Sequence, residues 1–237
     1  MKAYPLQSIS IEQAMDKQFR MVSCIMHNFG GYEQLSRGDL GIHQPENEPL
    51  TTMKAEEALA EFFNCEMAML VRGSGTGAIR YGLASMLKAN DKILIHDAPI
   101  YSTTKTSFEM LGLIPVTADF NDPESIRKVL NEDKDITAAL VQYSRQQIED
   151  HYDMKEVVET IRNTRDIPII TDDNYAVMKV EKIGVNAVQI FPASLPSNCR
   201  DRKGSASSSE RKNSSIRSER CTIQVAVRSR DMKLWTS

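Results

Sequence analysis

Short apolar runs alternate with amphipathic segments along most of the chain. The apolar runs lie at residues 68–71, 92–95, 114–117, 137–141 and 167–171, and each predicts a strand. Segments rich in helix formers lie between or beside them, at residues 51–63, 79–87, 102–111, 122–130 and 154–165. Continuous apolar strands with short connections to helices are typical of a parallel sheet buried on both faces. We therefore predict an α/β fold, with a mostly parallel sheet between two layers of helices.

The first fifty residues carry a weaker pattern. They are polar, only partly amphipathic and rich in turn formers, notably at residues 29–31, 37–39 and 44–46. We predict residues 1–50 as an entry segment and place the first regular element after it. Either Thr51 or Thr52 is a suitable N-cap for the helix that follows.

The pattern changes again near Val185. Residues 186–237 are basic, rich in serine and poor in large apolar side chains. From Gln189 onward there are 10 Lys plus Arg against 4 Asp plus Glu, whereas the preceding part has 19 against 28. Such a segment buries too little surface to offset a backbone ordering cost of about 1–2 kcal/mol per residue, so we predict a disordered tail.

Composition excludes several classes of protein. No apolar run is long enough for a membrane span, and the N-terminus lacks the apolar centre of a signal peptide, so we expect a cytoplasmic protein without membrane contact. The four cysteines show no paired CxxC spacing, and the four histidines form no helical ligand pair. We therefore expect neither a disulfide framework nor a metal site.

Candidate chemistry lies at the carboxyl ends of the predicted strands, where ligands of such sheets bind. The sequence Gly73-Ser74-Gly75-Thr76-Gly77 stands between a strand and a helix, where glycine amides and the helix start favour a phosphate. Gly73, Gly75 and Ala78 also satisfy the G-x-G-x-x-A form of the dinucleotide fingerprint, with Asp97 after the next strand. An NAD(P)-binding domain is therefore the alternative.

Three further strand ends carry polar or aromatic residues. Tyr101 follows strand 92–95, where its ring would lie against a planar heterocycle or pack on the adjoining helix. Residues 142–146 form a polar cluster that contacts a ligand or is a solvated loop. Asp172 and Asp173 follow strand 167–171, where a carboxylate would hold a ring nitrogen protonated, or would simply cap the chain or face solvent.

Together these four loops resemble the large domain of fold-type I pyridoxal-phosphate (PLP) enzymes, in particular the cystathionine synthase and lyase branch and its aminotransferase-like relatives. The resemblance covers about residues 30–185, so that residues 51–185 would be an incomplete PLP-binding large domain. It implies that the cofactor phosphate binds at Ser74, Gly75, Thr76 and Gly77. It also implies that Tyr101 stacks on the ring, and that Asp172, or failing it Asp173, faces the ring nitrogen. The dinucleotide alternative leaves Tyr101 and Asp172 without a role.

The resemblance implies an amino-acid substrate, proton removal from its α-carbon, transamination or elimination, and a homodimer in the intact family form. No arginine, among them Arg37, Arg80 and Arg145, is assigned to the substrate carboxylate. The family's Schiff-base lysine is expected 25 to 30 residues after the aspartate, but residues 193–200 contain no lysine. We therefore predict no catalytic residue here, an inactive chain as given, and at most a non-catalytic PLP-binding remnant.

A shift of reading frame would account for the missing lysine. Starting each codon after Asn186 one base earlier permits the sequence CGADLSCFSTFKLQGPEG as far as Gly204, continuing GIGVIVGKKEF. Its lysine codon spans Ser197 and Asn198, and the phrase resembles the family's lysine loop. We hypothesise a frameshift near Val185. The alternative is a genuine basic tail that binds acidic partners or nucleic acid. Of these two kinds of ligand, we do not expect nucleic acid.

Overall fold

The computed structural model describes residues 8–31, 49–65, 67–144, 147–174, 176–181 and 183. The predicted tail, residues 186–237, therefore lies outside the described residues, as does the stretch where the lysine is missing. Six helices and four strands follow one another in the order α1 (Ile11–Phe29), α2 (Leu50–Phe63), α3 (Ser74–Met86), β1 (Lys92–His96), α4 (Ser102–Leu111), β2 (Ile114–Ala118), α5 (Pro123–Glu132), β3 (Ile136–Gln142), α6 (Met154–Thr164) and β4 (Ile169–Asp172).

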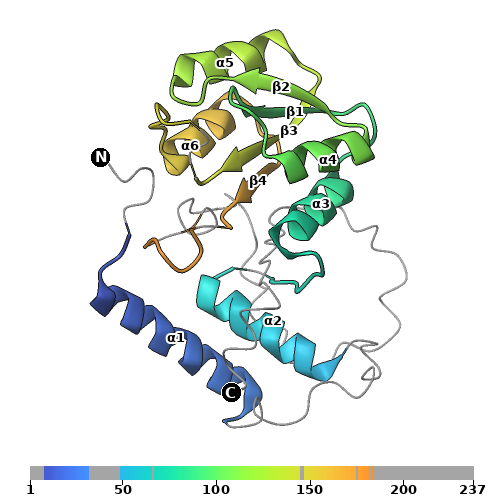
Figure 1. The fold of residues 1–237 in the computed structure, drawn as a ribbon. Coiled ribbons are helices and arrows are strands. Elements are labelled where there is room, and N and C mark those ends of the chain that lie inside the picture. The colour runs from blue at the N-terminus through green and yellow to red at the C-terminus, as the bar shows by residue number, and fades with distance from the viewer. Residues whose placement is uncertain are drawn as a thin grey trace.

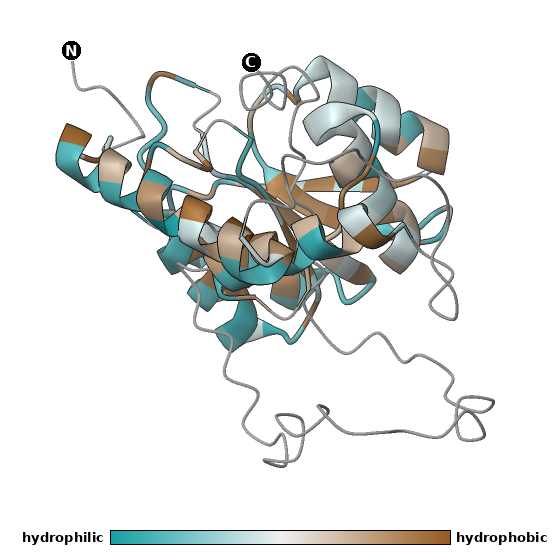
Figure 2. Ribbon diagram, turned by 90° about the horizontal axis from the view of Figure 1, so that it is seen from below, coloured by the Kyte–Doolittle hydropathy of each residue, from teal (hydrophilic) through white to brown (hydrophobic). Residues whose placement is uncertain are grey.

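The four strands form one parallel sheet in the order β2-β1-β3-β4 (Figure 1). Alternate residues of each strand face opposite helix layers. Ile93 and Ile95 pack with side chains of α3 and α4, whereas Leu94 packs with side chains of α5 and α6. In Figure 2 the hydrophobic colour is concentrated in the strands between the helices. The predicted α/β fold, with a parallel sheet covered on both faces, is confirmed.

The short helices begin where the sequence supplies acceptors for their first N–H groups. Asp122 accepts a hydrogen bond from the N–H of Glu124 at 3.0 Å, and Pro123 opens α5. Asp153 caps α6 in the same way. The start of α2 differs from the prediction, because this helix begins at Leu50 with Pro49 at the N-cap position and uses neither threonine as a cap.

The prediction that regular structure begins only after residue 50 was wrong for residues 11–29, which form α1. A capping box starts this helix, since Ser10 accepts from the N–H of Gln13 at 3.2 Å while the Gln13 side chain accepts from the N–H of Ser10 at 2.9 Å. Gly30, with a φ of 66°, ends it. Ile11 and Phe19 are exposed by 77 % and 65 %, so the packing of α1 does not follow its apolar pattern.

Helices α1 and α2 lie side by side below the sheet in Figure 1 and form a third layer. Arg20 of α1 donates to the carbonyl oxygen of Phe62 at 2.6 Å, and Lys17 donates to the carbonyl oxygen of Val180. Cys24, Phe62 and Val180 belong to one buried cluster. Helix α1 therefore holds both α2 and the segment that follows β4.

Two predicted boundaries around the glycine cluster also differ from the structure. Residues 68–71 form no strand, and only Ala68 makes an isolated bridge, because no ladder forms beside this segment among the described residues. Helix α3 begins at Ser74 and not at residue 79, so the glycine cluster is its first turn. Gly73, with a φ of 101°, makes the abrupt change of direction that lets the helix start so early.

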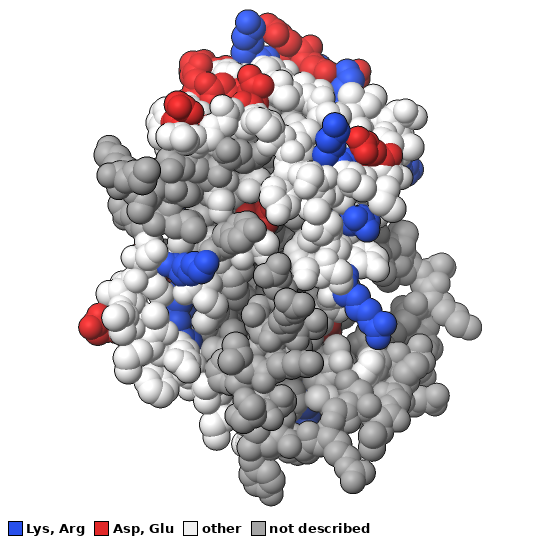
Figure 3. Space-filling model, viewed as in Figure 1, with Lys and Arg blue, Asp and Glu red and all other residues white. Residues whose placement is uncertain are grey.

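Among the helices that the structure describes, none is both long and apolar enough to cross a lipid bilayer. Positive and negative side chains are mixed over the face in Figure 3, and acidic side chains gather over α5 at its upper end. That distribution contrasts with the basic sequence of residues 186–237.

Candidate cofactor site

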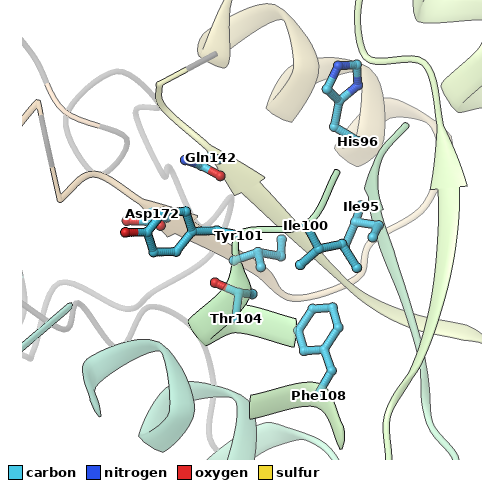
Figure 4. A pocket seen from close by; sticks show the side chains of 9 residues that line it. Ile95, His96, Ile100, Tyr101, Thr104, Phe108, Gln142 and Asp172 are labelled. Atoms are coloured by element: carbon cyan, nitrogen blue, oxygen red, sulfur yellow. The ribbon is translucent and has the colours of Figure 1, made fainter. Parts of the chain in front are cut away.

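A pocket opens at the carboxyl ends of β1, β3 and β4 (Figure 4). It encloses about 360 Å³ of space, its open mouth included. Its walls combine apolar and polar side chains from the strand ends and from α4: Ile95, His96, Ile100, Tyr101, Thr104, Phe108, Leu140, Gln142 and Asp172. Two of the predicted site residues, Tyr101 and Asp172, thus share one cavity at the predicted edge of the sheet.

Asp172 ends β4 and is the acidic group of the pocket. Burial raises the pKa of its carboxyl group, and the N–H of Asn174, which donates to Oδ1 at 3.2 Å, opposes that rise. No cation among the described residues contributes to this balance. The site therefore contains a largely buried carboxylate whose charge would be stabilised by a positively charged ligand group.

Asp173 has a different environment. Its Oδ2 accepts a hydrogen bond from the hydroxyl of Thr171 at 2.7 Å. Burial raises the pKa of Tyr143, and the charge of Asp173 raises it further. Tyr143 packs against the core on the α5 and α6 face, and also against the cluster of α1 and α2. Asp173 follows the end of β4 and, unlike Asp172, is not among the described residues that line the pocket.

Tyr101 is the N-cap residue of α4, and its side chain is exposed by 54 %. In Figure 4 its ring lies in front of Asp172, and both line the pocket. A ring that is partly open and beside a carboxylate is suited to stack on a planar heterocycle. Tyr101 is not fully buried, and its stacking on a ligand ring stays a prediction beside the alternative that it packs on the adjoining helix.

The glycine cluster reaches this pocket through two contacts. The hydroxyl of Thr76 donates to the hydroxyl of Thr103, two residues after Tyr101, at 3.0 Å. A Cβ atom at Gly75 would lie only 3.1 Å from Cγ of Asn174, two residues after Asp172. The loops that the sequence placed about a hundred residues apart are therefore neighbours in space.

The first turn of α3 offers N–H groups to an anion. The first bond within the helix runs from the N–H of Gly77 to the carbonyl oxygen of Gly73 at 2.9 Å. The N–H groups of Ser74, Gly75 and Thr76 precede it and have no acceptor inside the helix. Gly77 itself is close-packed, since a Cβ there would lie 2.2 Å from the carbonyl oxygen of Arg72.

The third predicted cluster, residues 142–146, is divided by the sheet. Gln142 ends β3, pairs in register with Asp172 and lines the pocket. Tyr143 packs into the core, and Arg145 and Gln146 lie outside the described residues. Only its first residue therefore joins the site among those that the structure describes.

Sequence reasoning missed the apolar part of the pocket, formed by Ile95, Ile100, Phe108 and Leu140. The alternation of side chains along a strand could have indicated two of them, because Ile95 and Leu140 lie near the carboxyl ends of β1 and β3 and face the same helix layer. Arg80, considered for a substrate carboxylate, donates to the hydroxyl of Ser107 at 3.3 Å and braces α3 against α4. Arg37 lies outside the described residues.

These residues fit the requirements of PLP. The cofactor needs donors for a phosphate, a flat surface for a ring and an anion for a protonated ring nitrogen. The start of α3, Tyr101 and Asp172 supply one of each, and a cavity connects Tyr101 with Asp172.

Comparisons with known proteins agree with this fit. The chain is 47 % identical to YhfS of Escherichia coli strain K12 over 184 residues, which are 78 % of this chain and 50 % of YhfS. The crystal structure of YhfS, described as a PLP-dependent protein, matches with a TM-score of 0.73 over 78 % of this chain and 50 % of that one. A carbon-sulfur lyase involved in aluminum resistance from Clostridium novyi NT shares the fold, with 22 % identity and a TM-score of 0.61 over 74 % and 46 % of the two chains.

No family model matches the chain. The chain spans about half the length of the relatives that it matches, 50 % in the case of YhfS. At 47 % identity over 184 residues the common ancestry of the chain and YhfS is plain. The chain is therefore homologous to part of YhfS, and its described α/β fold matches the large domain of the fold-type I PLP-dependent structures.

Proposed function

We propose that this fold seats PLP in a protein that acts on an amino acid, by transamination or elimination. The observation that carries the proposal is the shared pocket of Tyr101 and Asp172, near the N–H groups at the start of α3 that have no acceptor within the helix. Because the chain spans half of its relatives, the reaction and the substrate are proposals for the intact protein.

Each predicted residue has a distinct part in this proposal. The N–H groups of Ser74, Gly75 and Thr76 would bind the phosphate, with Gly77 permitting the close turn beneath them. Tyr101 would cover one face of the pyridine ring. Asp172 would accept a hydrogen bond from the protonated ring nitrogen, and its partly buried carboxylate would thereby gain a positive partner that none of the described residues supplies.

When bound, the cofactor supplies an electron sink for the bonds of an amino acid's α-carbon. The contribution of Asp172 is to keep a proton on the ring nitrogen, which strengthens that sink. The contribution of Tyr101 is to orient the ring and exclude water from one of its faces.

The experiment is a titration of the purified full chain with PLP, followed by absorbance. Asp172→Ala should weaken binding by at least about tenfold, the order expected on loss of a charge-assisted hydrogen bond. Asp173→Ala is the matched control, because Asp173 bonds Thr171 and does not line the pocket. Equal losses in the two variants would contradict the assignment of Asp172.

The NAD(P) alternative is tested in parallel by titration with NADH. The dinucleotide pattern assigns the side-chain carboxylate of Asp97 to a ribose, while its backbone carbonyl oxygen and N–H contact Gln147 and Ala118. Tight NADH binding without PLP binding would replace the proposed function. Aggregation without binding of either would identify an inactive fragment.

We also propose that this chain binds PLP without turnover, because residues 193–200 carry no lysine for covalent attachment. Borohydride treatment of the chain with PLP should therefore modify no single lysine, and modification at one defined lysine would refute this. We propose that a frameshift near Val185 produced the basic sequence of residues 186–237. Sequencing the gene across Val185 in independent isolates tests it, since an undisturbed open frame would show that the tail is genuine.

A further inference from the structure

A buried ionisable pair lies beside the pocket and has no part in the proposed cofactor contacts. His96 ends β1, and its Nε2 lies 2.9 Å from Oδ1 of Asp150. Each side chain is exposed by only 3 %. In Figure 4 the ring of His96 stands apart from Tyr101 and Asp172 and points away from them.

The backbone fixes the tautomer of His96. The N–H of Phe120 donates to Nδ1 at 3.1 Å, and a backbone N–H can only donate. Nδ1 must therefore carry a lone pair, so the proton of the neutral ring is on Nε2 and is donated to Asp150. His96 thus accepts a hydrogen bond from the loop after β2 and donates one to Asp150.

Hydrogen bonds link Asp150 to the loop that carries Tyr101. Its Oδ2 accepts from the N–H of Gln147 at 2.7 Å. The side chain of Gln147 donates in turn to the carbonyl oxygen of Asp97 at 3.0 Å. Residues 97–101 form the short loop between β1 and α4, so this chain of bonds holds the loop at its first residue.

Ring contacts extend the same unit to β3. His96 lies between Phe120 and Tyr152, with ring centroids 5.3 Å and 5.1 Å away. The hydroxyl of Tyr152 donates at 2.8 Å to the carbonyl oxygen of Gln142, which lines the pocket. The ends of β1 and β3 are therefore joined at the wall of the pocket, which His96 itself lines, by groups that have no part in the proposed cofactor contacts.

We infer that Asp150 is a positioning residue of the site: through His96 and Gln147 it sets the loop that presents Tyr101 to the ligand. This inference rests on the proposed PLP site, and it adds a network of supporting hydrogen bonds that fixes the orientation of a ligand-contacting residue.

The test compares Asp150→Asn and Gln147→Ala with the unchanged full chain. An asparagine places a donor where Asp150 accepted, so it must oppose either the Nε2–H of His96 or the N–H of Gln147, and the blocked Nδ1 prevents a change of tautomer. Nitrogen NMR of His96 should show an unprotonated Nδ1 in the unchanged chain. Both variants should bind PLP about tenfold more weakly, as is typical for loss of a supporting hydrogen bond.

Arg165→Met is the control for a general loss of stability. Arg165 donates to four backbone carbonyl oxygens, including that of Ile136 at 2.7 Å, at the opposite end of β3 from the pocket. This variant should unfold at lower urea while keeping its PLP affinity. The inference is overturned if the Asp150 and Gln147 variants bind PLP as tightly as the unchanged chain, or lose no more affinity than Arg165→Met does.

Amide hydrogen exchange of residues 97–101, measured without ligand, separates this inference from the proposed function. If the unchanged chain binds no PLP, the proposed function fails. Hydrogen exchange still decides whether the hydrogen bonds of Asp150 and Gln147 brace the loop of residues 97–101. Faster exchange of this loop in Gln147→Ala and Asp150→Asn, and not in Arg165→Met, supports the brace. Unchanged exchange in all three variants refutes it.

Discussion

Replacement of Gly77 by alanine should destabilise the chain, although alanine is the better helix former. The Cβ atom would lie 2.2 Å from the carbonyl oxygen of Arg72, whereas ordinary contacts are 3.4–4 Å. The two atoms must therefore separate by about 1 Å, and both belong to backbone that packing holds in place. The clash is with the turn that leads into α3 and not with a flexible side chain.

The net effect is the difference between two opposing contributions. Overpacking of this kind costs about 1–3 kcal/mol, and a backbone contact belongs at the upper end. The change from glycine to alanine inside a helix recovers up to about 1 kcal/mol. We therefore expect Gly77→Ala to lower the free energy of unfolding by about 2 kcal/mol.

Gly75→Ala is the matched variant, two residues away in the same helix. Its Cβ would lie 3.1 Å from Cγ of Asn174, an exposed side chain that can rotate away. The expected net change is below about 1 kcal/mol. Adding Asn174→Ala should remove any remaining cost of Gly75→Ala, which a double-mutant cycle would show.

Urea denaturation followed by circular dichroism measures these differences. With a slope of about 1–3 kcal/mol per molar urea, Gly77→Ala should lower the midpoint by about 1 M. An unchanged midpoint for Gly77→Ala, or a larger loss for Gly75→Ala, would refute the steric account. In that case a ligand contact, and not the close approach of Arg72, would be the reason for glycine at position 77.

Three further substitutions have definite expected outcomes. Burial raises the pKa of Asp172 above its ordinary value of 3.8, so its contribution to stability is greatest in acid and falls as pH rises through the raised pKa. Asp172→Asn should lack this fall and should have a higher urea midpoint than the unchanged chain near neutral pH. A lower midpoint for this variant would contradict the burial effect. Ser10→Ala removes the capping box with Gln13 and should cost about 1 kcal/mol, seen as faster amide exchange at the start of α1, and unaltered exchange would exclude the cap. Leu130→Ala should cost about 2–5 kcal/mol in thermal unfolding because Leu130 is 0 % exposed, while Ile11→Ala, at 77 % exposed, serves as its near-neutral control.

Much of the fold could be predicted because the strands of a doubly covered sheet are continuous apolar runs. Residues 138–141 of β3 are an example: Ala138 and Leu140 face one helix layer while Ala139 and Val141 face the other, so all four positions are apolar. Helix α5 was visible from its Asp-Pro-Glu start, since that order supplies both a cap and a preset first turn.

Helix α1 escaped prediction although its apolar residues have helical spacing, and the apolar residues Ile11, Met15, Phe19 and Met26 lie on an exposed part of the helix. Arg20 and Lys17 hold it to neighbouring carbonyl oxygens, while Ile11 and Phe19 remain exposed. The capping box at Ser10 was the local signal that could have revealed the helix. The start of α3 was misplaced for a related reason, because glycines inside a helix lower its propensity although the close approach of Arg72 requires Gly77.

The sequence by itself determined which strand ends carry chemistry, because side-chain type and the place where an apolar run stops are local properties. The residue pattern by itself left Asp172 and Asp173 open, and only the family resemblance preferred Asp172; nor did the pattern separate Gln142 from Tyr143, since neighbouring strand residues differ in the face to which they point. The tertiary structure places Asp172 and Gln142 in one pocket with Tyr101, whereas Asp173 accepts a hydrogen bond from Thr171. It alone brought His96 and Asp150 together, because a contact between residues 54 positions apart depends on how the whole sheet packs.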